Sequence, residues 1–229
     1  MSTQKRALIV VTSHAQLGDT GKPTGYYLPE VAHPYAALVA RGIEVDIASI
    51  AGGAAPLDPS SLQLNDPVNK QFWETPATRA KLEHTQPLSQ LDPGRYQAVL
   101  FAGGHGTMWD FPSSADVQRI AAAIYEAGGV VAAVCHGPAA LVNVKLPSGK
   151  YLVAGRQVAA FSDAEEEAAG LTKVMPFLLQ STLEQRGARY SKAALWQAHV
   201  QVDGRLVTGQ NPASAAGVGA AVATLLTGG

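Results

Sequence analysis

The only cysteine of the sequence is followed directly by a histidine, and this pair can carry out nucleophilic chemistry. Cys135-His136-Gly137-Pro138 comes immediately after the apolar run VVAAV over 130–134. A thiol at a sharp turn between a buried strand and a helix is placed like the nucleophile elbow of α/β hydrolases. We expect the helix that begins near Pro138 to favour the thiolate through its partly positive N-terminus. A lone intracellular cysteine is more often buried and inert, so the pair predicts a nucleophile only in this setting.

A second group of candidate residues follows another apolar run. Gly103-Gly104-His105-Gly106 comes after the run YQAVLFA over 96–102. A glycine pair at such a point can direct backbone N–H groups at a developing oxyanion. The alternative interpretation is an ordinary strand-to-helix turn.

Carboxylates that could assist the Cys-His pair occur at two places. Glu30 lies in the first turn of a predicted helix, where a carboxylate is electrostatically favourable in any case. An acidic run of the kind that usually begins a solvated helix lies further along, and we expect only one of its members to face His136. Its residues are Asp163, Glu165, Glu166 and Glu167.

Apolar spacing predicts strands and helices in alternation. Short apolar runs predict strands over 7–12, 44–49, 96–102 and 130–134, paired short strands within 151–160, and a hairpin over 200–208 across Asp203-Gly204. Helical spacing predicts helices over 29–40, 165–169, 176–186 and 213–226, and a further one that Ser114 caps and Gly128 ends. These are the elements of an α/β fold with a mostly parallel central sheet and helices on both faces. In such sheets, sites lie at the carboxyl ends of the strands.

Composition limits the class of protein and its partners. The 229 residues are 47% hydrophobic and 15% charged with a formal net charge of −1, which is typical of a globular chain without a nucleic-acid or membrane partner. One cysteine rules out an intrachain disulfide and a multi-cysteine metal cage. No apolar stretch approaches the ~20 residues of a membrane span, so we expect a cytoplasmic protein. We expect one domain over 1–229, with an insertion-like segment at about 51–93 that contains short helices over 68–73 and 76–84.

Five sequence blocks together resemble a known family. They are GYYLPEVAHPY (25–35), FAGGHGTMWDFP (101–112), AAVCHGPAAL (132–141), AFSDAEEE (160–167) and GRLVTGQNPASA (204–215). In this order they resemble the ThiJ/PfpI superfamily, of the class I glutamine amidotransferase-like fold, and most of all its branch with glyoxalase III and heat-shock-protein-31-like chaperones. The resemblance implies a flavodoxin-like α/β sandwich, a homodimer, and a Cys-His-acid site without metal or other cofactor.

The same resemblance implies roles for individual residues. Cys135 would be the nucleophile and His136 the general acid/base, with the backbone N–H groups of His136 and Gly104 as the oxyanion pocket. Gly103 and His105 would help to bind substrate beside it, and Glu30 would hydrogen-bond the thiol. Glu166 would orient the imidazole, although Asp163 and Glu165 remain alternatives for this acid.

The function that follows from the resemblance is that of a glyoxalase III-like lyase of the D-lactate dehydratase type. It would convert methylglyoxal or glyoxal to lactate or glycolate through a hemithioacetal on Cys135, without glutathione. Three alternatives stay open: a cysteine amidase or peptidase, a protein deglycase that uses the same site, and a stress-inducible holdase chaperone that does not need Cys135. Glutamine amidotransferase activity is disfavoured, because no His-x-Glu sequence occurs.

Overall fold

A seven-stranded sheet forms the centre of the protein, whose computed structural model describes residues 4–228. The strand order is β3-β2-β1-β4-β5-β9-β8. All neighbours pair in parallel except β8 and β9, which form the predicted antiparallel hairpin. The bounds are β1 Arg6–Val11, β2 Glu44–Ser49, β3 Gln86–Pro87, β4 Ala98–Phe101, β5 Val130–Val134, β8 Val200–Asp203 and β9 Leu206–Gly209.

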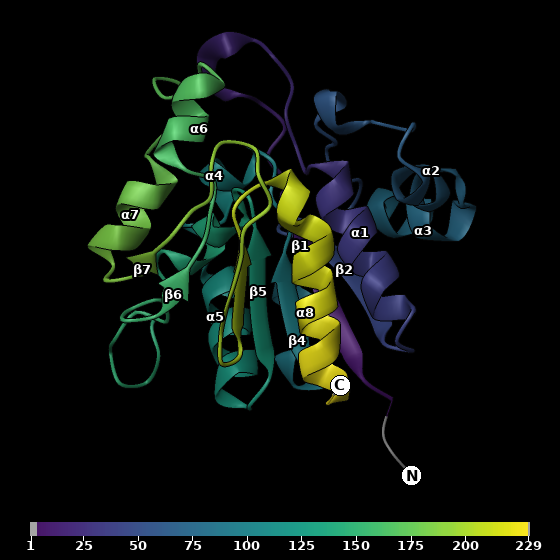
Figure 1. Cartoon of the computed structure of the whole chain (residues 1–229). Coiled ribbons are helices and arrows are strands. Elements are labelled where there is room, and N and C mark those ends of the chain that lie inside the picture. Colours follow the sequence, from purple (N-terminus) through teal and green to yellow (C-terminus); the bar gives the residue numbers. More distant parts are fainter. Residues whose placement is uncertain (1–3, 229) are drawn as a thin grey trace.

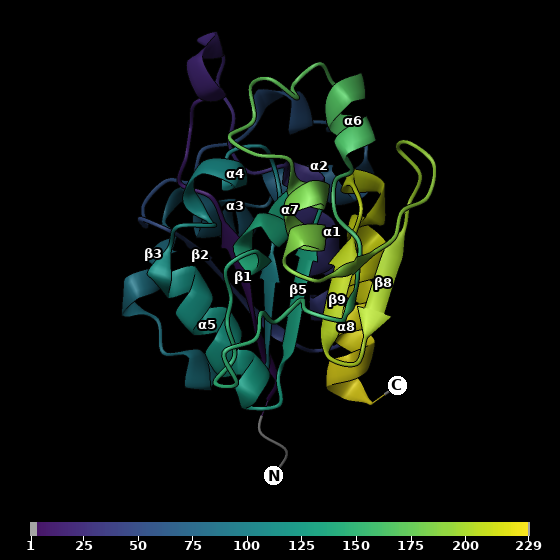
Figure 2. The ribbon, with the colours of Figure 1, turned by 90° about the vertical axis from the view of Figure 1, so that its left-hand side faces the viewer.

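Helices cover both faces of this sheet, as predicted (Figures 1 and 2). On one face α1 (Leu28–Val39) and α8 (Ala215–Thr227) lie side by side, with α2 (Pro67–Glu74) and α3 (Pro76–Glu83) beyond α1. On the other face lies α5 (Ala115–Glu126). The short helices α4 (Thr107–Asp110), α6 (Asp163–Ala168) and α7 (Leu179–Gln185) complete the set, and α4 and α6 lie near the end to which the strands point.

Alternation along β1 explains how one strand serves two cores. Leu8 and Val10 belong to the apolar cluster on the α5 side, and Ala7, Ile9 and Val11 belong to the cluster under α1 and α8. Successive side chains of a strand point to opposite faces, so a strand covered on both sides is apolar throughout. This is why the continuous apolar runs predicted parallel strands correctly.

Local capping and turn signals are also confirmed. The Ser114 side chain accepts a hydrogen bond from the Val117 N–H at 3.2 Å and so begins α5. Gly204 has φ 60° in the turn of the β8–β9 hairpin, a left-handed conformation that glycine adopts without penalty. Strands β2 and β5 have the predicted bounds, 44–49 and 130–134.

The segment 51–93 is packed against the sheet and α1. Its two helices are confirmed, and Phe72 of α2 belongs to the core under α1. The segment also adds β3, which pairs with the edge strand β2. This strand was not predicted, because two residues that include a proline carry no periodic signal.

Two predicted elements are wrong. Within 151–160 only β6 (Gln157–Val158) is a strand, and it pairs in parallel with β7 (Arg189–Tyr190) rather than with a near neighbour. Backbone hydrogen bonds from Ala154 to Tyr151 and from Arg156 to Val153 fold the first half of that stretch into turns. After Cys135 the chain forms only a 3₁₀ helix, Gly137–Leu141.

Among residues 4–228 no helix is long and apolar enough to cross a membrane.

Candidate active site

Cys135 lies in a strained turn at the carboxyl end of β5. Its φ is 61°, and among the described residues only Trp196 is another non-glycine residue with positive φ. Left-handed backbone costs an L-residue roughly 1–2 kcal/mol. Two backbone hydrogen bonds hold the turn, from the Cys135 N–H to Gly209 at 2.9 Å and from the Phe161 N–H to the Cys135 carbonyl at 2.8 Å. Strain that the surroundings enforce at a single cysteine is characteristic of a functional residue.

Glycine is required where the loop after β4 meets this turn. A Cβ on Gly103 would lie 2.5 Å from Oε2 of Glu30 and 2.7 Å from the Val134 carbonyl oxygen. Gly104 has φ +103°, and a Cβ there would lie 2.1 Å from the Gly25 carbonyl oxygen. The two glycines therefore allow three segments of the chain to meet beside Cys135, and their role in the sequence is steric as well as conformational.

His136 connects the sulfur to a buried carboxylate. Its Nδ1 lies 3.4 Å from Sγ of Cys135, and its Nε2 lies 2.7 Å from Oε2 of Glu166. Burial alone would raise the pKa of Glu166, but the charges of and hydrogen bonds from His136 and His105 lower it to about 2. An ionised Glu166 accepts the Nε2–H of His136, which leaves the Nδ1 lone pair directed at the sulfur.

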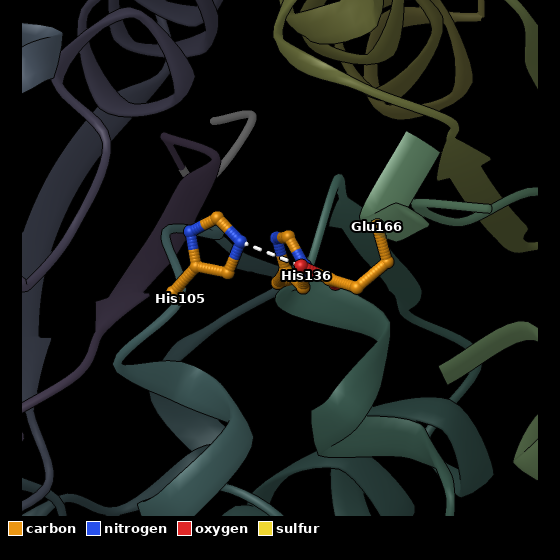
Figure 3. Close-up of side chains that lie close together, drawn as sticks. All are labelled: His105, His136 and Glu166. Carbon is orange, nitrogen blue, oxygen red and sulfur yellow. Dashed lines mark hydrogen bonds and ion pairs between the residues drawn. The ribbon is translucent and has the colours of Figure 1, made fainter. Parts of the chain in front are cut away.

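His105 shares this carboxylate. Its Nε2 lies 3.0 Å from Oε1 of Glu166, and its ring centroid lies 4.1 Å from that of His136. Figure 3 shows His105 linked to the end of the Glu166 side chain, with the His136 imidazole beside the same carboxylate. The sequence analysis predicts that His105 helps to bind substrate, but it does not predict that one glutamate binds both histidines.

Glu30 reaches the thiol from the first turn of α1. Its side chain is fully buried, and Oε2 accepts the Gly103 N–H at 2.7 Å. Burial raises the pKa of Glu30 to about 8, although the Cys135 thiol and the Gly103 N–H act in the opposite direction. At neutral pH Glu30 therefore keeps its proton and can donate a hydrogen bond.

The expected thiolate is not favoured in the resting site. Burial and the neighbouring Glu30 raise the pKa of Cys135 well above its ordinary value, and only the backbone N–H of His136 lowers it. The 3₁₀ helix that follows is five residues long, too short for the macrodipole on which the expectation depended. Burial and His105 also lower the pKa of His136, against the effect of Glu166. Thiol and imidazole are both neutral at rest, and proton transfer must accompany attack by the sulfur.

The other acids of the run face elsewhere. Glu165 is fully buried, but its Oε1 accepts hydrogen bonds from the Trp196 N–H, Gln210 Nε2 and Asn211 Nδ2 at 2.9–3.0 Å. Asp163 accepts a hydrogen bond from the Ser181 hydroxyl. Of the three alternatives, only Glu166 contacts His136.

Two aromatic residues at the site were not predicted. The Phe161 ring lies 4.2 Å from that of His136, and the Trp196 ring lies 5.8 Å from that of Phe161. Trp196 is 48% exposed although its backbone is strained, with φ 64°. Trp196 is the only Phe, Tyr or Trp in the stretch SKAALWQAH over 191–199, and this is the one sequence signal that could have identified it.

The imidazoles and carboxylate also form the geometry of a cation site. Ligand atoms of His105, His136 and Glu166 lie within 4.8 Å of one another, and this donor set suits a divalent transition metal. Each imidazole, however, already has its own carboxylate oxygen as hydrogen-bond partner. The hydrogen bonds of the cluster therefore already use one nitrogen of each imidazole.

Comparison with known proteins identifies relatives over nearly the whole chain. This protein is 33% identical to "Glyoxalase 3" of Candida albicans and 34% identical to "Glutathione-independent glyoxalase HSP31" of Saccharomyces cerevisiae. Each match covers 92% of this chain and 93% of the relative. Among solved structures, the 24 kDa Rapid Encystment Protein of Francisella tularensis matches with a TM-score of 0.94 and 40% identity over 97% of this chain and 99% of that one. Glyoxalase III from Candida albicans matches with a TM-score of 0.89 and 31% identity over 96% and 97%. Residues 24–224 match the model of the DJ-1/PfpI family, and the chain therefore belongs to that family.

Proposed function

We propose that this protein is a glutathione-independent glyoxalase that converts methylglyoxal or glyoxal to lactate or glycolate. The observation that carries the proposal is the connected Cys135–His136–Glu166 arrangement on a strained turn, with Sγ–Nδ1 and Nε2–Oε2 distances of 3.4 and 2.7 Å. Relatives named as glyoxalases at 33–34% identity support it. The two kinds of support are independent, because one concerns chemistry and the other descent.

The first step is addition of the sulfur to the aldehyde carbon, C1. The Cys135 thiol gives its proton to Nδ1 of His136 as the C–S bond forms, and Glu166 stabilises the resulting imidazolium. The carbonyl π pair becomes an oxyanion, for which the backbone N–H groups of Gly104 and His136 are the proposed donors. Protonated Glu30 places no negative charge beside the sulfur during this step. Gly103 and His105, from the same loop as Gly104, are the proposed substrate-binding residues.

The second step is an internal redox reaction. The hydrogen on C1 moves to C2 through an enediol, so that C1 is oxidised to a thioester while the C2 ketone is reduced to an alcohol. Water then releases the hydroxy acid and returns the thiol. Since one substrate carbon oxidises the other, we propose that the enzyme uses no cofactor.

The proposed setting follows from composition and from the relatives. The partner is a small reactive aldehyde, and the near-neutral charge gives no surface for nucleic acid or an anionic membrane. A homodimer in the cytoplasm is the proposed form, on the family resemblance.

The decisive experiment is lactate formation from methylglyoxal by the purified protein, with and without glutathione. We expect turnover that does not depend on glutathione and that Cys135→Ala abolishes, while the variant unfolds at the same temperature as the wild type or a few degrees away. Full activity of Cys135→Ala would overturn the proposal. Wild-type protein that cleaves amides, or a Cys135→Ala variant that still suppresses aggregation of a client protein, would favour the peptidase or chaperone alternatives.

A further inference from the structure

We infer that His105 is the catalytic base that carries the hydrogen from C1 to C2 of the substrate. The inference rests on the proposed glyoxalase function and assigns the one step for which that function leaves several bases available. His136 and Glu30 lie next to the thiol, and the ring of His105 lies 4.1 Å from that of His136. Tyr27 is also near, but burial raises its pKa to about 12, so at neutral pH it holds its proton and is no base. The contacts of each decide between them.

His136 has no nitrogen left for the substrate carbon. Nδ1 lies 3.4 Å from the sulfur and receives the thiol proton, while Nε2 is bound to Glu166 at 2.7 Å. Once the C–S bond has formed and C1 carries the oxyanion, both nitrogens of His136 carry protons and neither can act as a base. The ring is also 1% exposed, with the Phe161 ring against it at 4.2 Å.

Glu30 is excluded on a different ground. Its Oε2 accepts the Gly103 N–H at 2.7 Å, its Oε1 has no hydrogen-bond partner among the described residues, and the side chain is fully buried in the first turn of α1. Burial raises its pKa to about 8, so that at neutral pH the group is mainly an acid. It is suited to donating a hydrogen bond and poorly suited to removing a proton from carbon.

His105 has a basic nitrogen without a hydrogen-bond partner, which neither His136 nor protonated Glu30 offers. Its Nε2 is bound to Glu166 at 3.0 Å, and within residues 4–228 its Nδ1 has no hydrogen-bond partner. The carboxylate that polarises His136 therefore polarises His105 as well and leaves the Nδ1 lone pair available. The side chain is 19% exposed against 1% for His136, so it lies on the open side of the pair. The loop that carries it also supplies Gly104 to the proposed oxyanion pocket.

The step balances without a further reactant. Nδ1 of His105 removes the C1 hydrogen as a proton, the C–H electron pair forms the C1–C2 double bond, and the C2 carbonyl π pair becomes an enediolate oxygen. The His105 imidazolium returns the proton to C2, the C1 oxyanion becomes the thioester carbonyl, and the C2 oxygen takes the proton that Nδ1 of His136 received from the thiol. The product is an isomer of the hemithioacetal, and His105 ends the step neutral.

The test compares His105→Ala with His84→Ala. His84 is exposed and caps the C-terminal end of α3, so it serves as the matched control. We expect kcat for methylglyoxal to fall roughly 10²–10⁴-fold in His105→Ala, the usual contribution of a general base. Its KM and the rate at which iodoacetamide alkylates Cys135 should stay within about threefold of the wild type. Added imidazole should restore part of kcat, and methylglyoxal deuterated at C1 should react with a primary isotope effect in the rescued reaction. His84→Ala should behave as wild type throughout.

Three outcomes would overturn the assignment. His105→Ala with half or more of the wild-type kcat would leave the transfer to His136 or Glu30. Loss of Cys135 alkylation in parallel with kcat would mean that His105 only supports the sulfur. Intact alkylation without imidazole rescue would likewise show a structural role. Wild-type protein that forms no lactate would overturn the proposed function instead, and this inference with it.

Discussion

Glu165 and Glu166 are adjacent in the sequence, are both buried, and serve two different structures. The carboxylate of Glu166 binds His136 at 2.7 Å and His105 at 3.0 Å. The carboxylate of Glu165 closes the capping box of α6 with Ser162 and holds the backbone N–H of Trp196 at 3.0 Å. Successive side chains on a helix point about 100° apart, so adjacent residues of α6 can face different structures. Glu166 faces the two histidines, and Glu165 faces the loop that carries Trp196.

This division predicts different effects of two matched substitutions. Glu166→Gln removes the charge that stabilises the His136 imidazolium, and we expect kcat to fall roughly 100-fold or more. Glu165→Gln keeps one acceptor oxygen for the three N–H groups but places an NH2 donor against the Ser162 N–H that Oε2 accepts, and we expect the free energy of unfolding to fall by about 2–4 kcal/mol. Methylglyoxal turnover and urea unfolding of both variants would check this, and the reverse pattern would contradict it.

The close approach at Gly104 predicts a second matched pair. A Cβ there would lie 2.1 Å from the Gly25 carbonyl oxygen and 2.8 Å from the Tyr27 nitrogen, both of them backbone atoms that cannot turn aside. Gly128 also has positive φ, +86°, but open space around it. We expect Gly104→Ala to lower the free energy of unfolding by at least about 3 kcal/mol and Gly128→Ala by about 1 kcal/mol. If urea unfolding gave the same loss of unfolding free energy for Gly104→Ala and Gly128→Ala, only the positive φ of Gly104 would matter, and not the close approach of the Gly25 backbone.

Much of the fold could be predicted, because its signals are local. The run VVAAV predicts β5 to the residue, since a strand buried on both faces needs nothing but apolar side chains. Ser114 predicts the start of α5, since the cap and the N–H it satisfies are three residues apart. The pairing of β6 with β7 could not be predicted, because it joins two-residue strands that are far apart in the chain.

The main residues of the site could be predicted, but its electrostatics could not. Motif position indicates Cys135 and His136 at the end of β5, and the family resemblance indicates Glu30, which lies in the first turn of α1. Whether Glu165 or Glu166 faces His136 depends on the rotation of a six-residue helix, which sequence does not specify. The raised pKa of Cys135 comes from complete burial beside a second acid, and that burial exists only in the folded chain.

The left-handed backbone at Cys135 predicts that glycine is more stable there than alanine. Alanine keeps the penalty of φ 61°, whereas glycine does not, so we expect Cys135→Gly to unfold with about 1 kcal/mol more free energy than Cys135→Ala. Ala133 lies two residues earlier in β5 with ordinary strand geometry. Ala133→Gly should therefore lose about 1 kcal/mol. Both glycine variants losing stability relative to alanine would mean that the turn at Cys135 carries no strain.

Burial of Glu30 makes stability depend on pH with a definite sign. Its pKa rises from an ordinary 4.5 to about 8 in the folded chain. Between these values the folded state keeps a proton that the unfolded state releases. The free energy of unfolding therefore falls as pH rises through this window, by at most roughly 1.4 kcal/mol per unit. Below pH 4.5 both states are protonated and the effect vanishes.

Glu30→Gln removes this dependence, because the amide has no proton to lose. We expect the variant to gain stability relative to the wild type as pH rises from about 5 to about 8, even though its glyoxalase activity falls. Urea unfolding at several pH values in that range would measure the difference. Glu126→Gln, at an exposed glutamate that ends α5, is the control and should give a difference that does not change with pH. A constant difference for Glu30→Gln as well would show that Glu30 is ionised inside the folded protein. A charged carboxylate beside the sulfur would then oppose the negative charge that develops as the thiol loses its proton in the first step.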